Sequence, residues 1–292
     1  MVFAESMSLP GRFLTLGSDR VFVHRSGRRG APAVVLMHGY FVSHWMWRQI
    51  LPALAEDHDV IAFDWPGHGE SDRPPPDRYR YDAPAFLDTL VGVLDSLEVP
   101  KASLVGHSMG GGIALFAAAR RPERVTRLAV IDPFVYPFPL PVEGRLTLAP
   151  VVGGTLFKAA MSRALIRRVM RRDIYRDPAL ATEEWVDYLF ERINRPGGHD
   201  AVLASTRFLA ESTAISRSVR AVRAPTLIVW GEDDRLFPAS LGRRLQSDVA
   251  GSRLEIVPVC GHSPPEERPR ELLRLLQPFL RGEAVADPLA LV

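Results

Sequence analysis

The stretch that most constrains the fold of this chain is a glycine-rich turn between two apolar segments. Ala102–Val105 predicts a short buried strand, and Ile113–Arg121 predicts an alanine-rich helix that ends before Pro122. Between them, residues 106–110 read G-H-S-M-G. Glycines are needed on both sides of the serine because side chains would collide where the chain doubles back. The sequence therefore predicts a sharp strand-to-helix turn with the Ser108 hydroxyl exposed at its tip.

Ser108 in this setting is a candidate nucleophile. The turn opens a helix, so unpaired backbone N–H groups and the positive end of the helix dipole lie beside the hydroxyl. An oxyanion formed by attack of Ser108 would be stabilised there, and the Met109 N–H is the first expected donor. The alternative is a glycine-rich loop that matches the pattern by chance. The strand before the turn and the helix after it favour the catalytic interpretation.

Composition places few other demands on the chain. Its 292 residues are 47% hydrophobic and 24% charged, an ordinary balance for a globular protein with a large core. A net charge of +2 does not indicate nucleic-acid binding. One cysteine, Cys260, excludes an internal disulfide and suits a reducing compartment. We find neither a signal peptide in residues 1–20 nor a membrane-spanning run, and we expect a cytoplasmic protein whose oligomeric state the sequence does not indicate.

Short apolar runs alternate with helical patterns along most of the chain. Runs at 12–16 and 21–24 predict an antiparallel hairpin. Continuous apolar runs predict strands buried on both faces, at 33–37, 60–63, 102–105, 127–131, 226–230 and 253–257. Helical patterns span 45–56, 83–97 and 266–281. Buried strands joined by crossover helices predict an α/β fold with a largely parallel sheet covered on both faces.

One segment interrupts this alternation. Residues 133–141 contain four prolines and cannot continue a helix, and residues 145–212 show helical patterns without a convincing buried strand. We therefore predict a core domain of residues 1–133 and 213–292. Residues 134–212 form a helical cap over the carboxyl edge of the sheet, where ligands bind in such folds.

A serine nucleophile needs a base, and the chain has eight histidines from which to choose. His262 is favoured because it follows the last predicted strand, in a loop that returns over the strand ends. His38 and His68 lie in glycine-rich loops, where we expect them to hold the backbone. His107 is expected to face away from Ser108.

The base needs an acid to orient it, and two aspartates compete for this role. Asp234 follows the strand at 226–230, and Asp132 follows the preceding core strand. Because either strand end can present an acid, the residues alone leave both open. Asp64, in the loop at 64–71, is expected to stabilise its own loop.

A second oxyanion donor is expected in the loop after Met37. His38 and Gly39 let the backbone approach Ser108, and Tyr40 then offers its N–H. Only the backbone is needed for this role, so the tyrosine side chain can line the pocket. The alternative is a plain turn with an aromatic residue in the core.

Together these residues resemble the α/β-hydrolase superfamily, in particular members with a helical cap after the sixth strand. The resemblance runs from about Val34 to Phe279 and rests on five motifs in the family's order. These are H-G at 38–39, D-x-P-G-H-G-x-S at 64–71, G-x-S-x-G at 106–110, G-x-x-D-x-x-x-P at 231–238 and G-H-x-P-x-x-E-x-P at 261–269. It implies an eight-stranded sheet whose first pair is antiparallel to the rest, and neither a metal nor an organic cofactor. The order Ser108, Asp234, His262 in that pattern favours Asp234 over Asp132.

The resemblance also narrows the chemistry. Relatives that open epoxides or remove halide place aspartate where this chain has Ser108. It therefore implies a carboxylic ester hydrolase acting on apolar or aromatic small molecules. Serine relatives that cleave carbon–carbon bonds usually carry an aromatic residue after the catalytic histidine, where this chain has Ser263 and Pro264. Acyl transfer, peracid formation and a non-catalytic ligand receptor of the same fold remain open.

The cap offers weaker signals. Phe157, Met161, Leu165 and Val169 follow helical spacing, and we expect that face to pack on the core rather than form an acyl pocket. A group of arginines is expected to be a solvated face, with attraction to anionic lipid surfaces as the weaker alternative. Its members are Arg163, Arg167, Arg168, Arg171, Arg172 and Arg176. Candidates for an apolar entrance are Trp45, Phe134, Tyr136 and Phe138.

Overall fold

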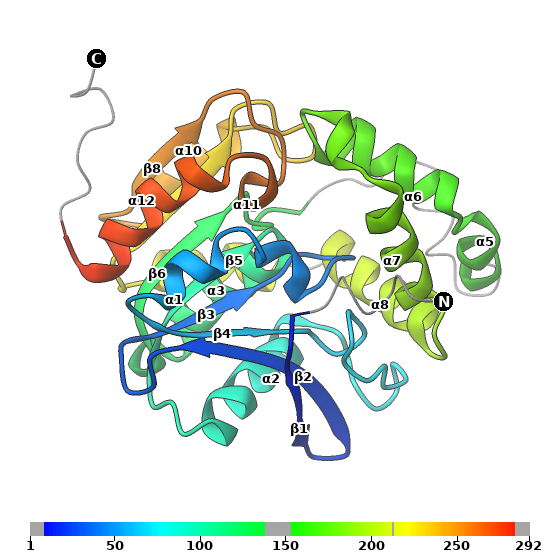
Figure 1. Cartoon of the computed structure of the whole chain (residues 1–292), viewed down its shortest axis with the longest axis horizontal. Helices are drawn as coiled ribbons and strands as arrows, with labels where there is room; N and C mark the ends of the chain where they lie inside the picture. Colours follow the sequence, from blue (N-terminus) through cyan, green and yellow to red (C-terminus); the bar gives the residue numbers. More distant parts are fainter. Residues whose placement is uncertain (1–8, 138–152, 212, 284–292) are drawn as a thin grey trace.

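The structure of the protein, a computed structural model, describes residues 9–137, 153–211 and 213–283. These residues contain one eight-stranded sheet in the order β1-β2-β4-β3-β5-β6-β7-β8 (Figure 1). The strands are β1 (Arg12–Leu16), β2 (Asp19–Gly27), β3 (Ala33–Met37), β4 (Asp59–Phe63), β5 (Ala102–His107), β6 (Val125–Ile131), β7 (Thr226–Gly231) and β8 (Arg253–Val257). Each predicted strand is present, most of them within two residues of the expected bounds.

The expectation that the first two strands both run antiparallel to the rest was right for β2 and wrong for β1. β2 runs antiparallel to both of its neighbours, β1 and β4, whereas the pairs from β4 to β8 are parallel. β1 therefore points the same way as β4, and β2 alone opposes the rest. The reason is that the tight turn after Leu16 reverses the chain once, and the connection from β2 to β3 reverses it again.

Helices connect the strands and follow them. The α-helices are α1 (Leu51–Ala55), α2 (Ala83–Ser96), α3 (Met109–Arg120), α5 (Gly153–Ala160), α6 (Arg163–Val169), α7 (Glu183–Ile193), α8 (Gly198–Glu211), α9 (Ala214–Ser218), α10 (Ser240–Asp248), α11 (Pro264–Glu267) and α12 (Pro269–Arg281). Short 3-10 and π turns are η2 (His44–Trp47), η3 (Pro122–Arg124), η4 (Met170–Ile174), η5 (Pro178–Leu180) and η6 (Val219–Ala221). The helix expected at 45–56 is two pieces, η2 and α1, and the closing helix is likewise divided into α11 and α12.

Alternating side chains of the strands fill two separate cores. In β3, Val35 and Met37 face a core built with α2, α3, α9 and α10, whereas Val34 and Leu36 face one built with η2, α1 and α12. A parallel strand buried on both faces has apolar residues at every position, as the sequence predicted. The sheet is thus covered on both sides, and its carboxyl edge remains for the site.

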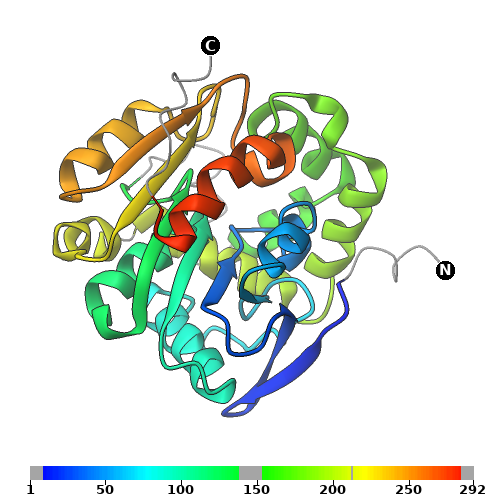
Figure 2. The same ribbon diagram turned by 60° about the vertical axis from the view of Figure 1, so that its left-hand side comes forward.

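Helices α5 to α8, which we call the cap helices or the cap, lie between β6 and β7 in the chain. Figures 1 and 2 show these helices gathered at one side of the sheet. They share a third apolar cluster that includes Ile166, Trp185 and Leu189. The division into a core of residues 1–133 and 213–292 and a cap of residues 134–212 stays a prediction, and Phe138 lies outside the described residues.

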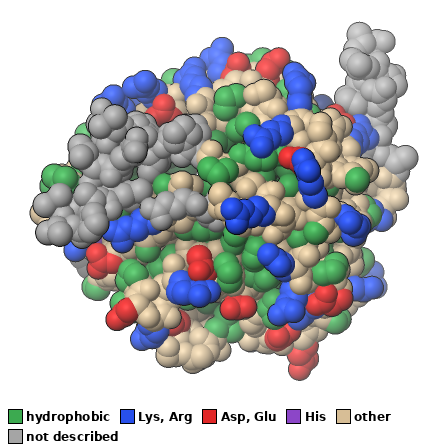
Figure 3. Space-filling model, turned by 180° about the vertical axis from the view of Figure 1, so that it is seen from behind, with side chains coloured by type: hydrophobic (Ala, Val, Ile, Leu, Met, Phe, Trp, Pro, Cys, Tyr) green, Lys and Arg blue, Asp and Glu red, His purple; other side chains and the backbone are tan. Residues whose placement is uncertain are grey.

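Two further observations concern the surface and the helices. Among the described residues, no helix is both long and apolar enough to cross a membrane. On the face drawn in Figure 3, acidic side chains lie between the basic ones. This mixed pattern agrees with the small net charge of +2.

Candidate active site

Ser108 lies at the tip of the turn between β5 and α3, with backbone angles φ 50° and ψ −117°. A positive φ is strained for a residue that carries a side chain. The turn is tight, because a Cβ on Gly106 would lie 2.5 Å from the Gly110 carbonyl oxygen. A Cβ on Gly110 would lie 2.3 Å from the Met37 carbonyl oxygen. Both glycines are therefore required, and the strand-to-helix turn has the form that the sequence predicted.

Ser108, His262 and Asp234 form a continuous chain of hydrogen bonds. Ser108 Oγ lies 3.0 Å from His262 Nε2, and His262 Nδ1 lies 2.7 Å from Asp234 Oδ2. All three residues are buried. Because an ionised carboxylate can only accept, Nδ1 carries the imidazole proton and Nε2 is left to accept from the serine hydroxyl.

Asp234 is held by its own loop. Its Oδ1 accepts hydrogen bonds from the Leu236 and Phe237 N–H groups at 2.8 and 2.9 Å. Burial alone would raise the pKa of the Asp234 carboxyl group. The charge and hydrogen bond of His262 together with these two amides outweigh burial, so that this pKa lies below its ordinary value. The group is therefore ionised at neutral pH.

The competing acid, Asp132, makes a different contact. Its Oδ1 accepts a hydrogen bond from the Gly231 N–H at 2.8 Å, which links the end of β6 to the end of β7. The hydrogen bond to His262 Nδ1 comes from Asp234. Both acids lie near His262, but the contact that an orienting acid needs is made by Asp234.

The loop after β3 approaches Ser108 as expected. A Cβ on Gly39 would lie 3.1 Å from Ser108 Cβ and 2.8 Å from His107 Nδ1, so that a side chain larger than glycine's would displace the loop. Tyr40, the residue that follows, borders the same cavity as Ser108. On the other side, Met109 is the first residue of α3, and its N–H has no partner within the helix.

The Tyr40 side chain continues into the cap. Its hydroxyl lies 2.6 Å from Thr206 Oγ1 on α8, and Thr206 in turn donates to the Val202 carbonyl at 2.8 Å. Tyr40, the expected second oxyanion donor, is thus tied to a cap helix. Sequence reasoning did not predict this contact, because Tyr40 and Thr206 are far apart in the chain.

The expectation that His38 and His68 hold the backbone was confirmed. The His38 ring bonds to the Gly39 carbonyl at 2.7 Å and accepts from the Trp65 N–H at 3.0 Å. Burial lowers the pKa of His38 to about 4, so the ring is neutral. His68 Nδ1 lies 3.2 Å from the Pro66 carbonyl oxygen. His107 points its Nε2 to the His262 carbonyl at 2.6 Å and holds the loop of that residue.

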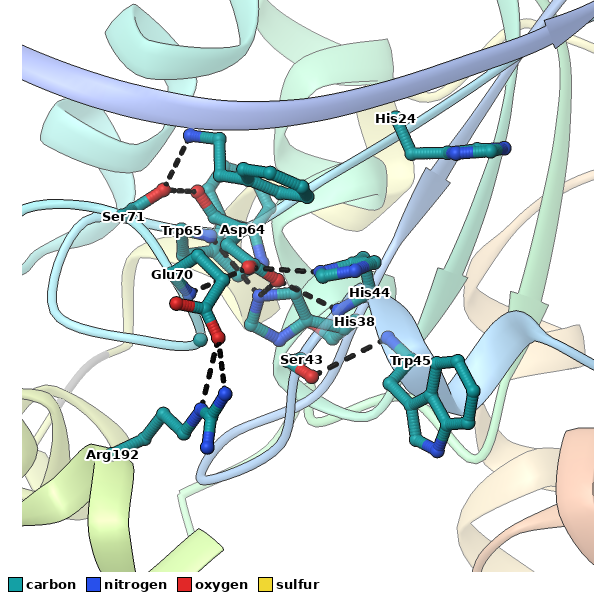
Figure 4. A network of polar contacts seen from close by, with 12 residues as sticks. His24, His38, Ser43, His44, Trp45, Asp64, Trp65, Glu70, Ser71 and Arg192 are labelled. Carbon is teal, nitrogen blue, oxygen red and sulfur yellow. Dashed lines mark hydrogen bonds and ion pairs between the residues drawn. The ribbon is translucent and has the colours of Figure 1, made fainter. Parts of the chain in front are cut away.

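His44 and Asp64 form a second buried histidine–aspartate pair, and Figure 4 shows its contacts. Asp64 accepts from the Glu70 N–H at 2.8 Å, as expected of a residue that stabilises its own loop. It also accepts from the backbone N–H and from Nδ1 of His44, at 2.7 and 2.9 Å. Burial would raise the pKa of Asp64, but His44, His38 and the Glu70 N–H outweigh it and lower this pKa to about 2.

Two acidic residues of the core hold the cap. Glu70 is ion-paired with Arg192 at 2.6 Å, a contact drawn in Figure 4, and with Arg195 at 2.7 Å. Glu266 accepts from the Tyr175 hydroxyl at 2.8 Å and is paired with Arg48 of the core. Neither contact was predicted, because each joins motifs that are separated by about a hundred residues.

A cavity of about 340 Å³ lies under the cap and reaches Ser108 and His262. Its walls are mainly apolar, and none of the described lining residues is a lysine or an arginine. The lining includes Tyr40, Phe41, Val42, Met46, Phe134, Met161, Leu165, Ile166, Val169, Met170, Trp185, Leu189, Leu209, Leu236, Phe237 and Glu266.

This lining corrects one prediction about the cap. The helical face of Met161, Leu165 and Val169 was expected to pack on the core, but these side chains border the cavity. Phe157, which was expected on the same face, is on α5 and is buried in the apolar cluster of the cap, whereas Leu165 and Val169 are on α6 and Met161 lies between the two helices. The spacing thus predicted one continuous helix face that the structure divides, and it could not show that a cavity lies beside it.

Among the aromatic residues expected at an entrance, Phe134 borders the cavity. Tyr136 instead donates a hydrogen bond to Asp248, and Trp45 packs against the cap cluster. The arginine group is largely neutralised by pairing. Five of its six members form ion pairs, namely Arg163 with Asp187, Arg167 and Arg171 with Glu183, Arg172 with Asp173, and Arg176 with Asp233.

Three buried side chains carry atoms that could bind a metal ion. Within the described residues, Asp132, Asp234 and His262 bring one ligand atom each within 4.8 Å of one another. His262 Nδ1 and Asp234 Oδ2 are already hydrogen-bonded to each other.

Comparisons with known proteins agree with this architecture. Residues 32–269 match the model of a family described as the alpha/beta hydrolase fold. The chain is 34% identical to 2-hydroxymuconate semialdehyde hydrolase of Pseudomonas sp. strain CF600, over 96% of each chain. It is 32% identical to 2-hydroxy-6-oxo-2,4-heptadienoate hydrolase of Pseudomonas putida strain F1, over 94% of this chain and 97% of the relative.

A solved structure is similar as well. The meta-cleavage product hydrolase CumD of Pseudomonas fluorescens IP01 superposes with a TM-score of 0.78 at 27% identity, over 93% of this chain and 98% of that one. The fold, the family model and these relatives together show that the chain belongs to the α/β-hydrolase family and is a hydrolase.

Proposed function

We propose that this protein is a serine hydrolase in which Ser108 is the nucleophile, His262 the general base and Asp234 the orienting acid. The observation that carries the proposal is the unbroken contact from Ser108 Oγ through His262 to Asp234 at 3.0 and 2.7 Å, beside an apolar cavity. Each group then has the protonation state that its role needs.

The reaction proceeds through an acyl-enzyme. Ser108 Oγ attacks the acyl carbon while His262 Nε2 takes the serine proton. The backbone N–H groups of Tyr40 and Met109 hold the oxyanion. When the intermediate collapses, the leaving alcohol takes the proton from His262. A water molecule then gives a proton to His262 and attacks the acyl carbon. The bond to Ser108 Oγ breaks, Ser108 takes the proton back from His262, and the acid is released.

The cavity favours an uncharged apolar substrate, and we propose a carboxylic ester. At about 30 Å³ for each water-sized group, 340 Å³ holds roughly eleven such groups beyond the reacting carbon. This corresponds to a medium-length acyl chain or an aromatic ester. The apolar wall formed by Met161, Leu165 and Val169 suits either one.

Carbon–carbon bond hydrolysis is the second candidate. It is favoured by the relatives, whose names describe cleavage of muconate and dienoate compounds. Such substrates carry a carboxylate, which a buried site binds through cations or several N–H donors. The described cavity wall offers no lysine or arginine, and it contains the acidic Glu266. Ester hydrolysis is therefore our first choice.

A substrate panel separates the two candidates. We would measure turnover of p-nitrophenyl esters from acetyl to palmitoyl, and of a 2-hydroxy-6-oxodienoate, by the wild type and Ser108→Ala. We expect ester turnover with an optimum at medium chain length and little activity on the dienoate. Faster turnover of the dienoate than of any ester would favour the carbon–carbon hydrolase. Ester turnover that persists in Ser108→Ala would overturn the role of Ser108.

Compartment and partners are part of this proposal. A single buried cysteine, Cys260, suits a cytoplasmic enzyme that is never stabilised by an internal disulfide. The substrate is its expected partner. The pairing of five cap arginines with acidic residues weakens the case for a basic, lipid-binding face.

A further inference from the structure

Two carboxyl groups are buried side by side at the ends of adjacent strands. Asp132 follows β6, and Asp234 lies three residues beyond β7. One ligand atom each of Asp132, Asp234 and His262 lies within 4.8 Å of the others, and Asp132 is completely buried. The mechanism above uses Asp234 and leaves Asp132 without a role.

The two groups differ in the donors that surround them. Asp234 accepts from His262 and from the N–H groups of Leu236 and Phe237. Asp132 accepts from the Gly231 N–H at Oδ1, and its Oδ2 has no hydrogen-bond donor among the described residues. Two negative charges this close in a buried site repel each other, so one group keeps its proton. The group with fewer donors is the one that keeps it.

The other charged groups around Asp132 also favour its protonated form. Burial is the largest cause that raises the pKa of Asp132, and the charges of Asp234 and Glu267 raise it further, against a smaller lowering by the Gly231 N–H. The nearby thiol of Cys260 is neutral, because burial raises its pKa. His262, the base in this group, is already engaged by Asp234.

The backbone directs the Asp132 side chain to this place. Asp132 has a φ of 43°, and its N–H donates to the Val229 carbonyl at 3.0 Å. Aspartate tolerates positive φ better than most residues, yet the conformation is still strained. The contacts to Val229 and Gly231 thus fix the carboxyl group between β6 and β7, facing Asp234.

We propose that Asp132 is a positioning residue that stays protonated at neutral pH and donates a hydrogen bond from Oδ2 to the Asp234 carboxylate. This bond holds Asp234 against His262. Keeping Asp132 neutral also avoids a second negative charge, which would stabilise the imidazolium and leave His262 unable to accept the serine proton. The inference rests on the proposed roles of Ser108, His262 and Asp234.

Substitutions at Asp132 test this by kinetics. In Asp132→Asn the amide oxygen can accept from Gly231 and the amide N–H can donate to Asp234, whereas Asp132→Leu can do neither. We expect kcat/KM of Asp132→Asn at pH 7 within about threefold of the wild type, with an unmoved acidic limb of the pH profile. Asp132→Leu should lose on the order of tenfold. An acidic limb that moves down by about one pH unit in Asp132→Asn would show that a negative charge had been removed and would overturn the proposal.

A second measurement does not depend on activity. The folded protein raises the pKa of Asp132, so its stabilising contribution is fully present below the unfolded pKa of about 4 and is lost as pH rises through the folded pKa. Asparagine does not titrate. The Tm of Asp132→Asn minus that of the wild type should therefore increase from pH 4 to pH 8. A flat or falling difference would overturn the protonated state.

The control for that measurement is Asp59→Asn. Asp59 is equally buried but is ion-paired with Arg25 at 2.6 Å, so its substitution should not produce the same rise. If Ser108 proved to have no catalytic role, the kinetic test would lose its meaning. The Tm measurement would still decide whether Asp132 carries a proton, so the two failures can be told apart.

Discussion

Two buried histidine–aspartate pairs lie at the carboxyl edge of the same sheet. In one, His262 Nδ1 is 2.7 Å from Asp234 Oδ2, and in the other, His44 Nδ1 is 2.9 Å from Asp64 Oδ2. Each aspartate follows a strand, and all four side chains are buried. By distance and burial alone, the pairs are nearly equivalent.

They differ in what lies beyond the imidazole. His262 Nε2 faces Ser108 Oγ at 3.0 Å and borders the cavity. His44 packs its ring 4.8 Å from the ring of Phe22, and its Nε2 has no hydrogen-bond partner among the described residues. The comparison teaches that a buried pair becomes a candidate for catalysis only where a nucleophile and space for a substrate adjoin it. Without a nucleophile and such a space, a buried pair only holds two loops together.

The largest expected effect is on the pair beside Ser108. His262→Ala should lower kcat by on the order of 10⁴ or more, and Ser108→Ala by a similar factor, because each removes the activated nucleophile. Asp234→Asn should lower kcat somewhat less. Steady-state kinetics on the best ester of the panel measures all three. If Asp132→Asn lowered kcat more than Asp234→Asn, the assignment of the acid would be wrong.

The second pair should affect stability instead. The pKa of Asp64 is lowered to about 2, so its contribution is present above the unfolded pKa of about 4 and is lost as pH falls toward 2. The shift from 3.8 to about 2 is roughly 1.8 pKa units, which corresponds to about 2.5 kcal/mol. Asp64→Asn should therefore destabilise the protein by about 2.5 kcal/mol at pH 7 and by roughly half as much at pH 3, where Asp64 is still mostly ionised in the folded protein. Denaturant unfolding at both pH values measures this, and an equal loss at both would contradict the account.

Filling the space beside His262 should alter the substrate range. Leu165→Trp places a larger side chain on the cavity wall. We expect on the order of a tenfold loss of kcat/KM on dodecanoyl relative to acetyl esters. Leu156→Trp is the matched control, because Leu156 is 45% exposed on α5 and does not line the cavity. A parallel loss on both esters would indicate a disturbed cap rather than a shortened pocket.

The smallest effect is expected from His44→Asn. Asparagine can place an N–H near the Nδ1 position and keep the hydrogen bond to Asp64. Since His44 is not in contact with Ser108 in our account, kcat should change by less than about threefold and stability by about 1 kcal/mol. A kcat loss as large as that of His262→Ala would erase the distinction between the two pairs.

The positions of the strands along the chain and the turn at Ser108 could be predicted because their signals are local. Continuous apolar runs mark strands buried on both faces, and the spacing of Gly106, Ser108 and Gly110 allows few conformations. His262 could be proposed as the base because it follows a strand whose end lies at the same sheet edge as Ser108, whereas the choice of Asp234 over Asp132 came from the family pattern. The direction of β1 was predicted wrongly, since it depends on which neighbour each strand pairs with.

Contacts made across the fold were not predictable in the same way. Nothing near His44 indicates that its ring meets Asp64, and nothing near Tyr40 indicates Thr206. The closeness of Asp132 to Asp234 depends on the register between β6 and β7. Likewise, the spacing of Met161, Leu165 and Val169 predicts one helix face, but the break between α5 and α6 at Met161 and the cavity beside these side chains depend on how the cap packs on the core.

The central claim is that His262, and not His44, activates Ser108. It is tested most directly by labelling the protein with a fluorophosphonate and locating the adduct by peptide mass spectrometry, which requires no knowledge of the substrate. We predict rapid labelling of Ser108 in the wild type and in His44→Asn, and little or none in His262→Ala. Labelling at another serine, or equal labelling of Ser108 in His262→Ala, would contradict the account.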